Sequence, residues 1–330
     1  MKRITYSSFG AARDVLTLSE CETPRPGIGE VLVKLAFSGV NPSDVKVRAG
    51  GRPGVTAPAF EQITPHSDGA GEIEAVGTGI PAELIGKRVW IWNGQWNRPF
   101  GTAATHIVVP AAQAVPLPDD VSFEVGASLG IPGLTACQTV FGSGDVNNKT
   151  VLVQGAAGNV GYLALQLARW GGARVIATAR DKDKARCFAA GAHAVVDFTA
   201  PDAAARILDA NEGQLVERII EPEFGVNVRT DTEVIAPDGV IAAYGSARNM
   251  TPEIPFMAMM FRNISLVTTL VYILPPEKRT IAINRLNSAL KSGALECPVD
   301  TVYPLGECAT AHEAVELGVR RGAILLDVNQ

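Results

Sequence analysis

The segment at residues 151–180, VLVQGAAGNVGYLALQLARWGGARVIATAR, most constrains the fold, because an apolar strand enters a Gly-rich turn, a helix and a second strand. Ala156, Gly158 and Gly161 occupy the three positions of a GxGxxG fingerprint. Small residues at these positions permit a tight turn, close approach of the backbone to a pyrophosphate, and close helix packing. The phosphate is expected on the helix N-terminus. The segment therefore predicts a dinucleotide-binding βαβ unit.

The end of the second strand distinguishes between the two nicotinamide cofactors. An NAD site usually has Asp or Glu about 20 residues after the glycines, whereas this chain has Thr178, Ala179 and Arg180. The Arg180 guanidinium suits a ribose 2′-phosphate, and Lys184 adds a second positive charge at helical spacing. Asp181 leaves NAD open, because a one-residue shift would put a carboxylate beside the ribose. The residues favour NADPH, unless Arg180 and Lys184 form only a solvated face.

Length and composition indicate a two-domain enzyme that stays in the cytoplasm. The 330 residues exceed the size at which a single core usually stops growing. A formal charge of -5 and the lack of a basic run argue against nucleic acid. The apolar stretch at residues 264–274 is too short to cross a bilayer and reads as a strand, and the first residues lack a signal peptide's apolar core. The five cysteines are scattered, which fits reduced thiols.

The pattern of apolar residues changes near Phe123 and again near Arg262. Before Phe123, short alternating runs bounded by Gly and Pro predict strands. Between the two points strands alternate with helices, which predicts a parallel sheet covered by helices. The fold class is therefore α/β, with a doubly wound nucleotide-binding domain at residues 124–262 and a β-rich domain at 1–123 and 263–330. Expected strands cover 30–38, 71–76, 87–92, 150–154, 174–178, 194–197, 217–220 and 240–244, and expected late helices cover 276–292 and 308–317.

Several motifs together resemble one family of oxidoreductases. They are GVNPSDVKVRAG at residues 39–50, PHSDGAGEIEAVG at 65–77, IGKRVW at 85–90, GIPGLTA at 130–136 and GAAGNVG at 155–161. Over nearly its whole length the chain is similar to the zinc-independent medium-chain dehydrogenases/reductases of the quinone oxidoreductase, or ζ-crystallin-like, branch. The resemblance implies a GroES-like catalytic domain, a Rossmann domain inserted into it, and an active site in the cleft.

A zinc alcohol dehydrogenase of the same superfamily is an alternative that can be checked at its ligand positions. There this chain has Asn41, then Ser67 followed by Asp68, and a position near Ile131, while His66 is one position out of step. Catalytic zinc needs about three N, S or O ligands. The four histidines show neither ligand nor triad spacing, so structural roles are expected for them. We therefore expect no metal.

Without a Lewis acid, hydride delivery to an already electrophilic quinone or activated alkene is the easier chemistry. The protein must then orient the cofactor and place donors at the oxygen that gains charge. The resemblance suggests that Asn41 contacts the nicotinamide or the acceptor carbonyl, while Asp44 and Arg48 organise the same loop. The alternative is that Asn41 and Pro42 simply form a turn. Many relatives have Tyr where this chain has Lys46, so Lys46 or solvent would supply the proton.

The other expected contacts come from an aromatic segment and from strand ends. Three of the four tryptophans cluster at residues 90–96, and Trp92 and Trp96 are predicted to form a wall for a flat acceptor, although most Trp is largely buried in any fold. Strand ends of such sheets face the ligand crevice. The cofactor contacts expected are Asn41, Thr135, Ala157, Gly158, Asn159, Val160, Gly161, Thr178, Arg180, Lys184, Tyr244, Gly245 and Ser246.

The predicted function is an NADPH-dependent quinone oxidoreductase that reduces quinones or α,β-unsaturated carbonyl compounds without metal. An enoyl-thioester reductase is one alternative, but the basic surface that a phosphopantetheine tail needs is not obvious. An NADPH-binding, crystallin-like structural or regulatory protein is an alternative of another class. Relatives are commonly dimers, so we expect a homodimer that pairs through the strand at residues 264–273. The apolar patch at residues 256–261 is expected in core or subunit packing.

Overall fold

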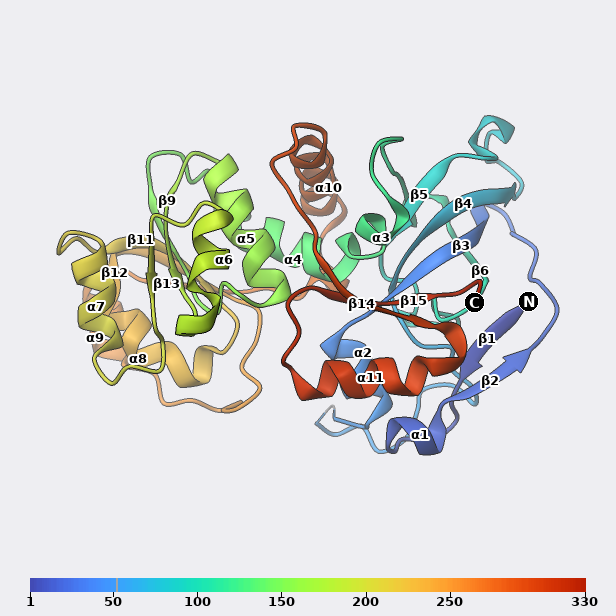
Figure 1. Ribbon diagram of the computed structural model, residues 1–330, viewed down its shortest axis with the longest axis horizontal. Coiled ribbons are helices and arrows are strands. Elements are labelled where there is room, and N and C mark those ends of the chain that lie inside the picture. Colours follow the sequence, from blue (N-terminus) through green and yellow to red (C-terminus); the bar gives the residue numbers. More distant parts are fainter. Residues whose placement is uncertain (52) are drawn as a thin grey trace. The chain divides into compact units, whose positions relative to one another are not determined.

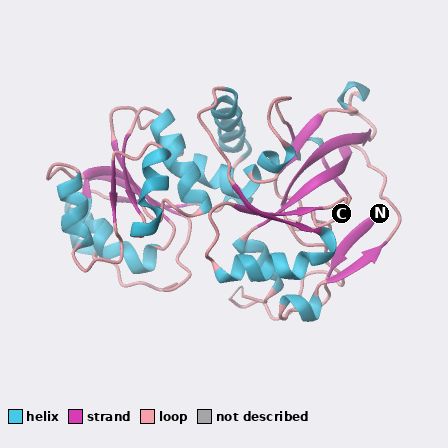
Figure 2. Cartoon of the chain, in the orientation of Figure 1, coloured by secondary structure: helices cyan, strands magenta, loops and turns pink. Residues whose placement is uncertain are grey.

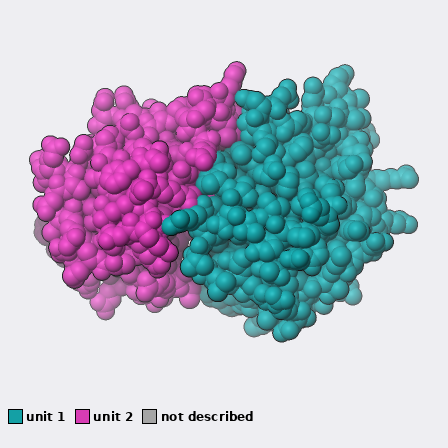
Figure 3. All heavy atoms as spheres, viewed as in Figure 1, with its two compact units in different colours: residues 1–131, 297–330 teal, residues 132–296 magenta. Residues whose placement is uncertain are grey.

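The computed structural model describes residues 1–51 and 53–330, and they divide into two compact units (Figure 3). Unit 1 comprises Met1–Ile131 and Cys297–Gln330, and unit 2 comprises Pro132–Glu296. The first boundary lies close to the expected one, but the second lies after residue 296, not after 262. The expected division was wrong there because residues 263–296 pack onto unit 2: their strand extends its parallel sheet, and their long helix contacts its first helix.

Unit 2 is built on a six-stranded sheet of order β10-β9-β8-β11-β12-β13, in which every neighbouring pair is parallel. Helices flank this sheet (Figure 2), and its central strands are continuous runs of buried Val, Ile, Leu and Ala, as expected when both faces are covered. The predicted doubly wound sheet is confirmed. Its strands are β8 (Thr150–Val153), β9 (Arg174–Thr178), β10 (Ala194–Val196), β11 (Val216–Glu221), β12 (Ile235–Ala243) and β13 (Ser265–Thr268). Its helices are α4 (Leu134–Phe141), α5 (Asn159–Trp170), α6 (Lys184–Ala189), α7 (Ala203–Ala210), α8 (Phe224–Val234), α9 (Phe256–Phe261) and α10 (Pro276–Lys291).

The last elements of unit 2 differ in how well the sequence predicts them. Helix α10 matches the helix expected at residues 276–292 to within one residue. Strand β13 is shorter than expected, because the chain turns into a single 3-10 turn at Val271–Ile273. β13 is the edge of the sheet. None of the helices in the described part of the chain has both the length and the hydropathy that a bilayer span requires.

Unit 1 contains a seven-stranded sheet of order β14-β15-β3-β4-β5-β7, with β6 also paired to β3, and a two-stranded sheet of β1 and β2 (Figure 1). Val31, Val33 and Leu35 of β3 are buried in its core. Antiparallel pairing of β15 with β3 brings residues 297–330 into this unit. The strands are β1 (Lys2–Thr5), β2 (Thr17–Glu20), β3 (Glu30–Val40), β4 (Asp68–Val76), β5 (Arg88–Ile91), β6 (His106–Pro110), β7 (Ala114–Pro116), β14 (Val299–Pro304) and β15 (Ala323–Asp327). The helices are α1 (Ala12–Val15), α2 (Pro42–Arg48), α3 (Phe123–Gly126) and α11 (Cys308–Leu317).

Candidate functional site

The Gly-rich turn of unit 2 lies where the parallel strands end. Carboxyl ends of parallel strands meet at one edge of a sheet, and ligands bind there in open α/β folds. Gly155 has a φ of +61°, a conformation that favours glycine, and a Cβ on Gly161 would lie 2.5 Å from the Gly155 carbonyl oxygen. Gly158 is the N-cap of α5 and offers no side chain to cap it. The first N–H groups of α5 therefore form a site that suits an anion.

A buried hydrogen-bonded network supports this turn. The Gly155 N–H donates to Thr178 Oγ1 (3.0 Å), and Thr178 Oγ1 donates to Gln154 Oε1 (2.7 Å). Gln154 Nε2 in turn donates to Asp231 Oδ1 (2.9 Å) on α8. Thr178 is expected to contact the cofactor, but its hydroxyl is buried and engaged within the protein. Its observed role is to hold the turn in place.

A carboxyl pair, Glu221 and Asp231, ends the network. Glu221 is the last residue of β11, and its carboxylate also accepts from Asn227 Nδ2 (3.1 Å). Burial raises the pKa of Glu221 to about 7. Burial, followed by the neighbouring Glu221, raises the pKa of Asp231 well above its usual range. Two buried carboxyl groups in contact hold protons more tightly than they would in water, because two adjacent charges are unfavourable.

We expect Asp231→Asn to flatten the pH dependence of stability. The native pair holds protons at a pH where the unfolded chain, with carboxyl pKa values near about 4, has lost them. The free energy of unfolding therefore falls as pH rises from about 4 through the raised pKa of Glu221. Asn can still accept from Gln154 and can donate to Glu221, so the variant should lose part of this slope. Urea unfolding between about pH 5 and pH 8 measures it, with exposed Asp209→Asn as the control. An unchanged slope would show that the raised pKa values of this carboxyl pair do not determine the pH dependence of stability.

Arg180 and Lys184 both lie beyond the end of β9, as expected, but their charges are placed differently. Arg180 is exposed. Lys184 Nζ forms a 2.7 Å ion pair with Asp181 Oδ1. The ion pair partly neutralises Lys184 and engages the carboxylate that could have favoured NAD. Arg180 is therefore the stronger candidate for contact with a phosphate.

A pocket of 440 Å³ in unit 2 lies beside the ends of β12 and β13. Tyr244, Gly245 and Ser246 line it, together with Lys278 of α10. Ser246 Oγ accepts from the Gly225 N–H (2.9 Å), which fixes its position. Thr135 is buried in α4. The structure thus brings the three predicted residues after β12 to one pocket.

Unit 1 carries the loop that is predicted to hold the catalytic residues. Asn41 precedes α2, and its Nδ2 donates to Asp68 Oδ2 (2.8 Å), while its backbone N–H donates to Asp44 Oδ2 (2.8 Å). Asp68 Oδ2 also accepts from the Ile131 N–H (2.8 Å). The side chains of Asn41, Asp44 and Asp68 are all buried. Burial, followed by the Asp44 charge, raises the pKa of Asp68 well above its usual range. These bonds hold the Asn41 amide in one orientation.

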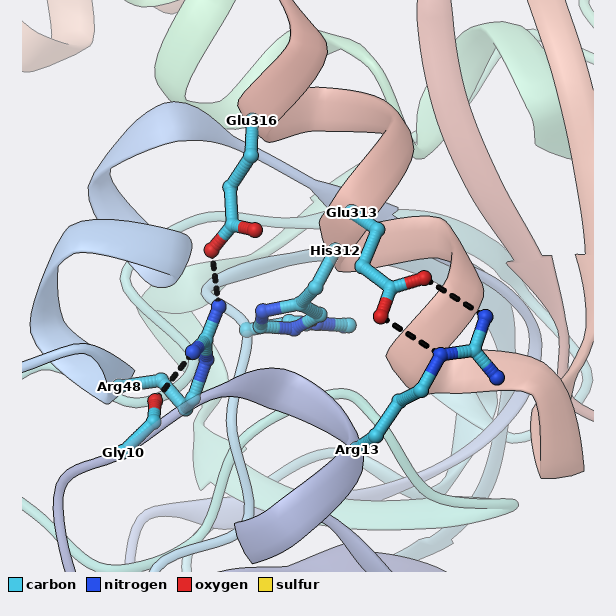
Figure 4. Close-up of polar contacts among 7 residues, drawn as sticks. Gly10, Arg13, Arg48, His312, Glu313 and Glu316 are labelled. Carbon is cyan, nitrogen blue, oxygen red and sulfur yellow. Dashed lines mark hydrogen bonds and ion pairs between the residues drawn. The ribbon is translucent and has the colours of Figure 1, made fainter.

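Arg48 and Lys46 lie on the same helix, α2, in different surroundings. Arg48 is buried, and its guanidinium donates to the Gly10 carbonyl and pairs with Glu316 of α11 (Figure 4). These contacts anchor the loop, which agrees with the organising role expected for Arg48. Lys46 is exposed.

Trp92 and Trp96 are both half-buried. Trp96 lines a pocket of 90 Å³ in unit 1, together with Val47 and Phe60. Trp92 does not line this pocket. The structure therefore brings only one of the two predicted aromatic residues to it.

Three acidic residues of these sites have no predicted role as site residues: Asp68, Glu221 and Asp231. Each forms hydrogen bonds with residues of other elements that meet it only in the fold. Asp68, for example, accepts from Asn41, which is 27 residues away. A usable signal for Asp68 is an acidic residue at the start of the Gly-rich, apolar run DGAG. An acidic residue at the end of the apolar strand VERIIE is the corresponding signal for Glu221.

The residues at the zinc-ligand positions of unit 1 form hydrogen bonds with one another. The Asn41 amide nitrogen donates to Asp68, and the Asp68 carboxylate is shared between Asn41 and the Ile131 N–H. Zinc is bound by Cys, His or carboxylate ligands, and among these positions only Asp68 offers one. The donor set does not fit a zinc ion, and no step of the proposed mechanism uses one there.

Two family models match the chain. The alcohol dehydrogenase GroES-like domain matches residues 27–119, within unit 1. The zinc-binding dehydrogenase model matches residues 159–288, within unit 2. These matches confirm the expected combination of a GroES-like and a nucleotide-binding domain.

Relatives with known names or structures match the chain over nearly its full length. Quinone oxidoreductase of Rattus norvegicus is 29% identical, covering 96% of this chain and 94% of its own. A structure described as an NAD-dependent alcohol dehydrogenase has a TM-score of 0.89 at 27% identity, covering 99% and 100%. A mycobacterial protein complexed with NADPH has a TM-score of 0.86 at 28% identity, with the same coverage. Because the matches extend across both units, the chain belongs to the medium-chain dehydrogenase/reductase family of oxidoreductases, in the branch that contains the quinone oxidoreductases.

Proposed function

We propose that this protein is an NADPH-dependent quinone oxidoreductase, which transfers hydride from NADPH to quinones or α,β-unsaturated carbonyl compounds. The observation that carries the proposal is the exposed Arg180. It follows the carboxyl end of β9, on the side of the sheet where the Gly-rich turn follows the carboxyl end of β8. Similarity to a quinone oxidoreductase and to a structure solved with NADPH supports it.

Residues of unit 2 would hold the cofactor, which supplies a hydride when it is bound. The N-terminus of α5 would bind the diphosphate, since Gly158 lets it approach the backbone closely. Arg180 would bind the 2′-phosphate. The pocket lined by Tyr244, Gly245 and Ser246 is our candidate for the nicotinamide end.

Asn41 of unit 1 is our candidate for contact with the acceptor. Its amide is buried and already oriented by Asp68, so it would donate to an oxygen that gains charge without first reorganising. Asp44 holds the backbone of the same residue. Lys46 is exposed, so it or solvent would deliver the proton.

Oxidation of NADPH and of NADH, followed by absorbance, tests the proposal. The acceptors are phenanthrenequinone and an α,β-unsaturated ketone, with a chelator present throughout. We expect NADPH-selective turnover that survives the chelator. Tight NADPH binding without turnover would instead support the structural or regulatory protein, and turnover of an enoyl thioester alone would support the enoyl reductase.

We expect Arg180→Ala to weaken the binding of NADPH but not that of NADH. A hydrogen bond to a charged group contributes about 1.5–3 kcal/mol, so the KM for NADPH should rise by about 10-fold to 100-fold. The KM for NADH should change little, because NADH lacks the phosphate. Steady-state kinetics with both cofactors measure the split. The matched control is Arg206→Ala, which removes an arginine whose ion pair with Asp202 is exposed. Equal effects on the two cofactors would contradict the assignment.

We also propose that two copies pair beside β13. Edge strands offer unpaired backbone groups, and large apolar side chains are exposed on β13, on the adjoining turn and on α9. They are Phe256, Met257, Met260, Phe261, Leu266, Leu270 and Ile273. Light scattering should give the mass of a dimer, and Leu266→Lys should shift it toward monomer. A monomeric wild-type protein would overturn this proposal.

A further inference from the structure

Unit 1 contains a buried cluster of two imidazoles and a thiol that the proposed reaction does not use. One ring nitrogen each of His66 and His312 and the Sγ of Cys308 all lie within 4.8 Å of one another. The two Nε2 atoms are 2.8 Å apart, and Cys308 Sγ lies 3.9 Å from His66 Nε2. Cys308 and His312 are four residues apart on α11, so they share a helix face. His66 comes from the loop before β4.

The hydrogen bonds on the far side of His66 determine where its proton lies. Thr102 Oγ1 donates to the Asp68 carbonyl oxygen (2.6 Å), which can only accept. Ser38 Oγ must therefore donate to Thr102 Oγ1 (2.8 Å) and accept from His66 Nδ1 (2.9 Å). His66 Nδ1 carries the proton, and Nε2 presents a lone pair to His312 and Cys308. A histidine that binds a metal commonly has its other N–H engaged in this way.

Hydrogen bonding alone does not satisfy His312. The ring centroids are 5.1 Å apart with planes at 25°, so with Nε2 atoms at 2.8 Å the rings lie nearly end to end. If His312 donates from Nε2, its Nδ1 is a buried acceptor with no hydrogen-bond partner in the described residues. If Nδ1 carries the proton instead, two lone pairs face each other. A cation between the Nε2 atoms removes the repulsion of the second arrangement, and the His312 Nδ1–H then remains a donor without a partner in the described residues.

Burial disfavours a charge on either imidazole, and it likewise raises the pKa of the Cys308 thiol, so the thiolate forms only as a metal binds. Burial, followed by Arg48, lowers the pKa of His312 to about 3, and Figure 4 shows the Arg48 guanidinium close to the His312 ring. Burial, followed by His312, lowers the pKa of His66 well below its usual range. His66 also has a φ of 77°, which is unfavourable for a residue with a side chain. Strained conformations cluster at functional sites, and six other non-glycine residues of the described chain also have a positive φ.

We propose that His66 Nε2, His312 Nε2 and Cys308 Sγ form a binding site for a thiophilic first-row metal ion of the Zn²⁺ or Cu⁺ type. Imidazole and thiolate ligands suit these ions, whereas Mg²⁺ and Ca²⁺ prefer oxygen. As the S–metal bond forms, the Cys308 thiol releases its proton to solvent. To give zinc–nitrogen distances near 2.0–2.1 Å at a tetrahedral angle, the two Nε2 atoms must separate by about half an ångström, and the rings must tilt so that both lone pairs point at the ion. This site is separate from the zinc-ligand positions at Asn41, Ser67 and Ile131.

Metal titration of the chelator-stripped full chain tests the proposal. Co²⁺ serves as the spectroscopic probe, and Zn²⁺ and, without oxygen, Cu⁺ are measured in competition with chromophoric chelators. We expect a single ion per chain, a thiolate-to-cobalt charge-transfer band, and a higher Tm with Zn²⁺. Cys308→Ser should abolish the band, and His312→Gln should lower the affinity for Zn²⁺ by more than about 10-fold. The control Cys137→Ser, a buried thiol of unit 2, should retain both.

X-ray absorption of the wild-type protein with bound Zn²⁺ keeps the test independent of whether the variants fold. One sulfur and two imidazole ligands are expected. Failure of both Zn²⁺ and Cu⁺ to compete with the chelators, or a cobalt band that survives Cys308→Ser, would overturn the proposal. Quinone reductase activity is not part of the readout, so this test and that of the proposed function can fail separately.

Discussion

Replacing Gly161 with Ala will lower both the stability of the protein and its affinity for NADPH. The new Cβ would lie 2.5 Å from the Gly155 carbonyl oxygen and 2.9 Å from the Ala156 Cα, and both are backbone atoms that cannot turn away. The turn must separate from α5, which should cost about 3 kcal/mol of unfolding free energy. Because the helix N-terminus is displaced, the affinity for NADPH should fall by more than about 10-fold. Urea unfolding and a fluorescence titration with NADPH measure the two effects.

Gly158→Ala is the matched control for this prediction. Its Cβ would meet only the Gly155 carbonyl oxygen, at 3.3 Å, so stability should change little. NADPH affinity should still fall, because Gly158 is where the diphosphate is proposed to approach the backbone. If Gly161→Ala unfolds at the same urea concentration as the wild type, the packing argument for the turn is wrong.

Asp68→Ala is expected to have the second largest effect, on both stability and quinone reduction. It removes the acceptor of the Asn41 amide and of the Ile131 N–H. Each buried donor left unpaired costs about 1–3 kcal/mol, so the two together should lower the free energy of unfolding by about 2–6 kcal/mol. Because Asn41 would lose its fixed orientation, kcat should fall by about 100-fold. Denaturation and steady-state kinetics, with the fraction folded checked, give both values.

Glu72→Ala is the control, since Glu72 lies on the same strand, β4, but is exposed. It should leave stability and kcat nearly unchanged. Asp68→Asn keeps an acceptor and should lie between Asp68→Ala and the wild type. A wild-type rate in folded Asp68→Ala would exclude Asn41 orientation as a factor in catalysis.

Local patterns allowed most of unit 2 to be predicted from the sequence. The turn between β8 and α5 and the helix α10 depend on spacings within one segment, and the structure confirms them. The domain boundary at 262 was wrong because β13 is the sixth strand of the sheet, and nothing near residue 262 shows which sheet it joins. Strand membership depends on pairing, which is not local.

The polar clusters could not be predicted because their members meet only after folding. His66 and His312 are 246 residues apart, and each alone resembles an ordinary structural histidine. Asn41 was predicted, since its motif is local, but its partner Asp68 was not. Thr178 was assigned to the cofactor from its place at the end of β9, whereas its hydroxyl is engaged inside the turn. Proximity to a site in the sequence does not determine where a side chain points.

The pairing of β15 with β3 has a consequence for how the chain is made. Every residue of unit 2 lies between these two strands in the sequence, so a ribosome completes unit 2 before it synthesises β15. Until then residues 37–40 of β3 lack β15 as a strand partner, and Arg48 lacks its partner Glu316. Domains generally fold as units during synthesis. The inserted unit therefore folds first, and it shortens the loop that must close when β15 finally joins β3.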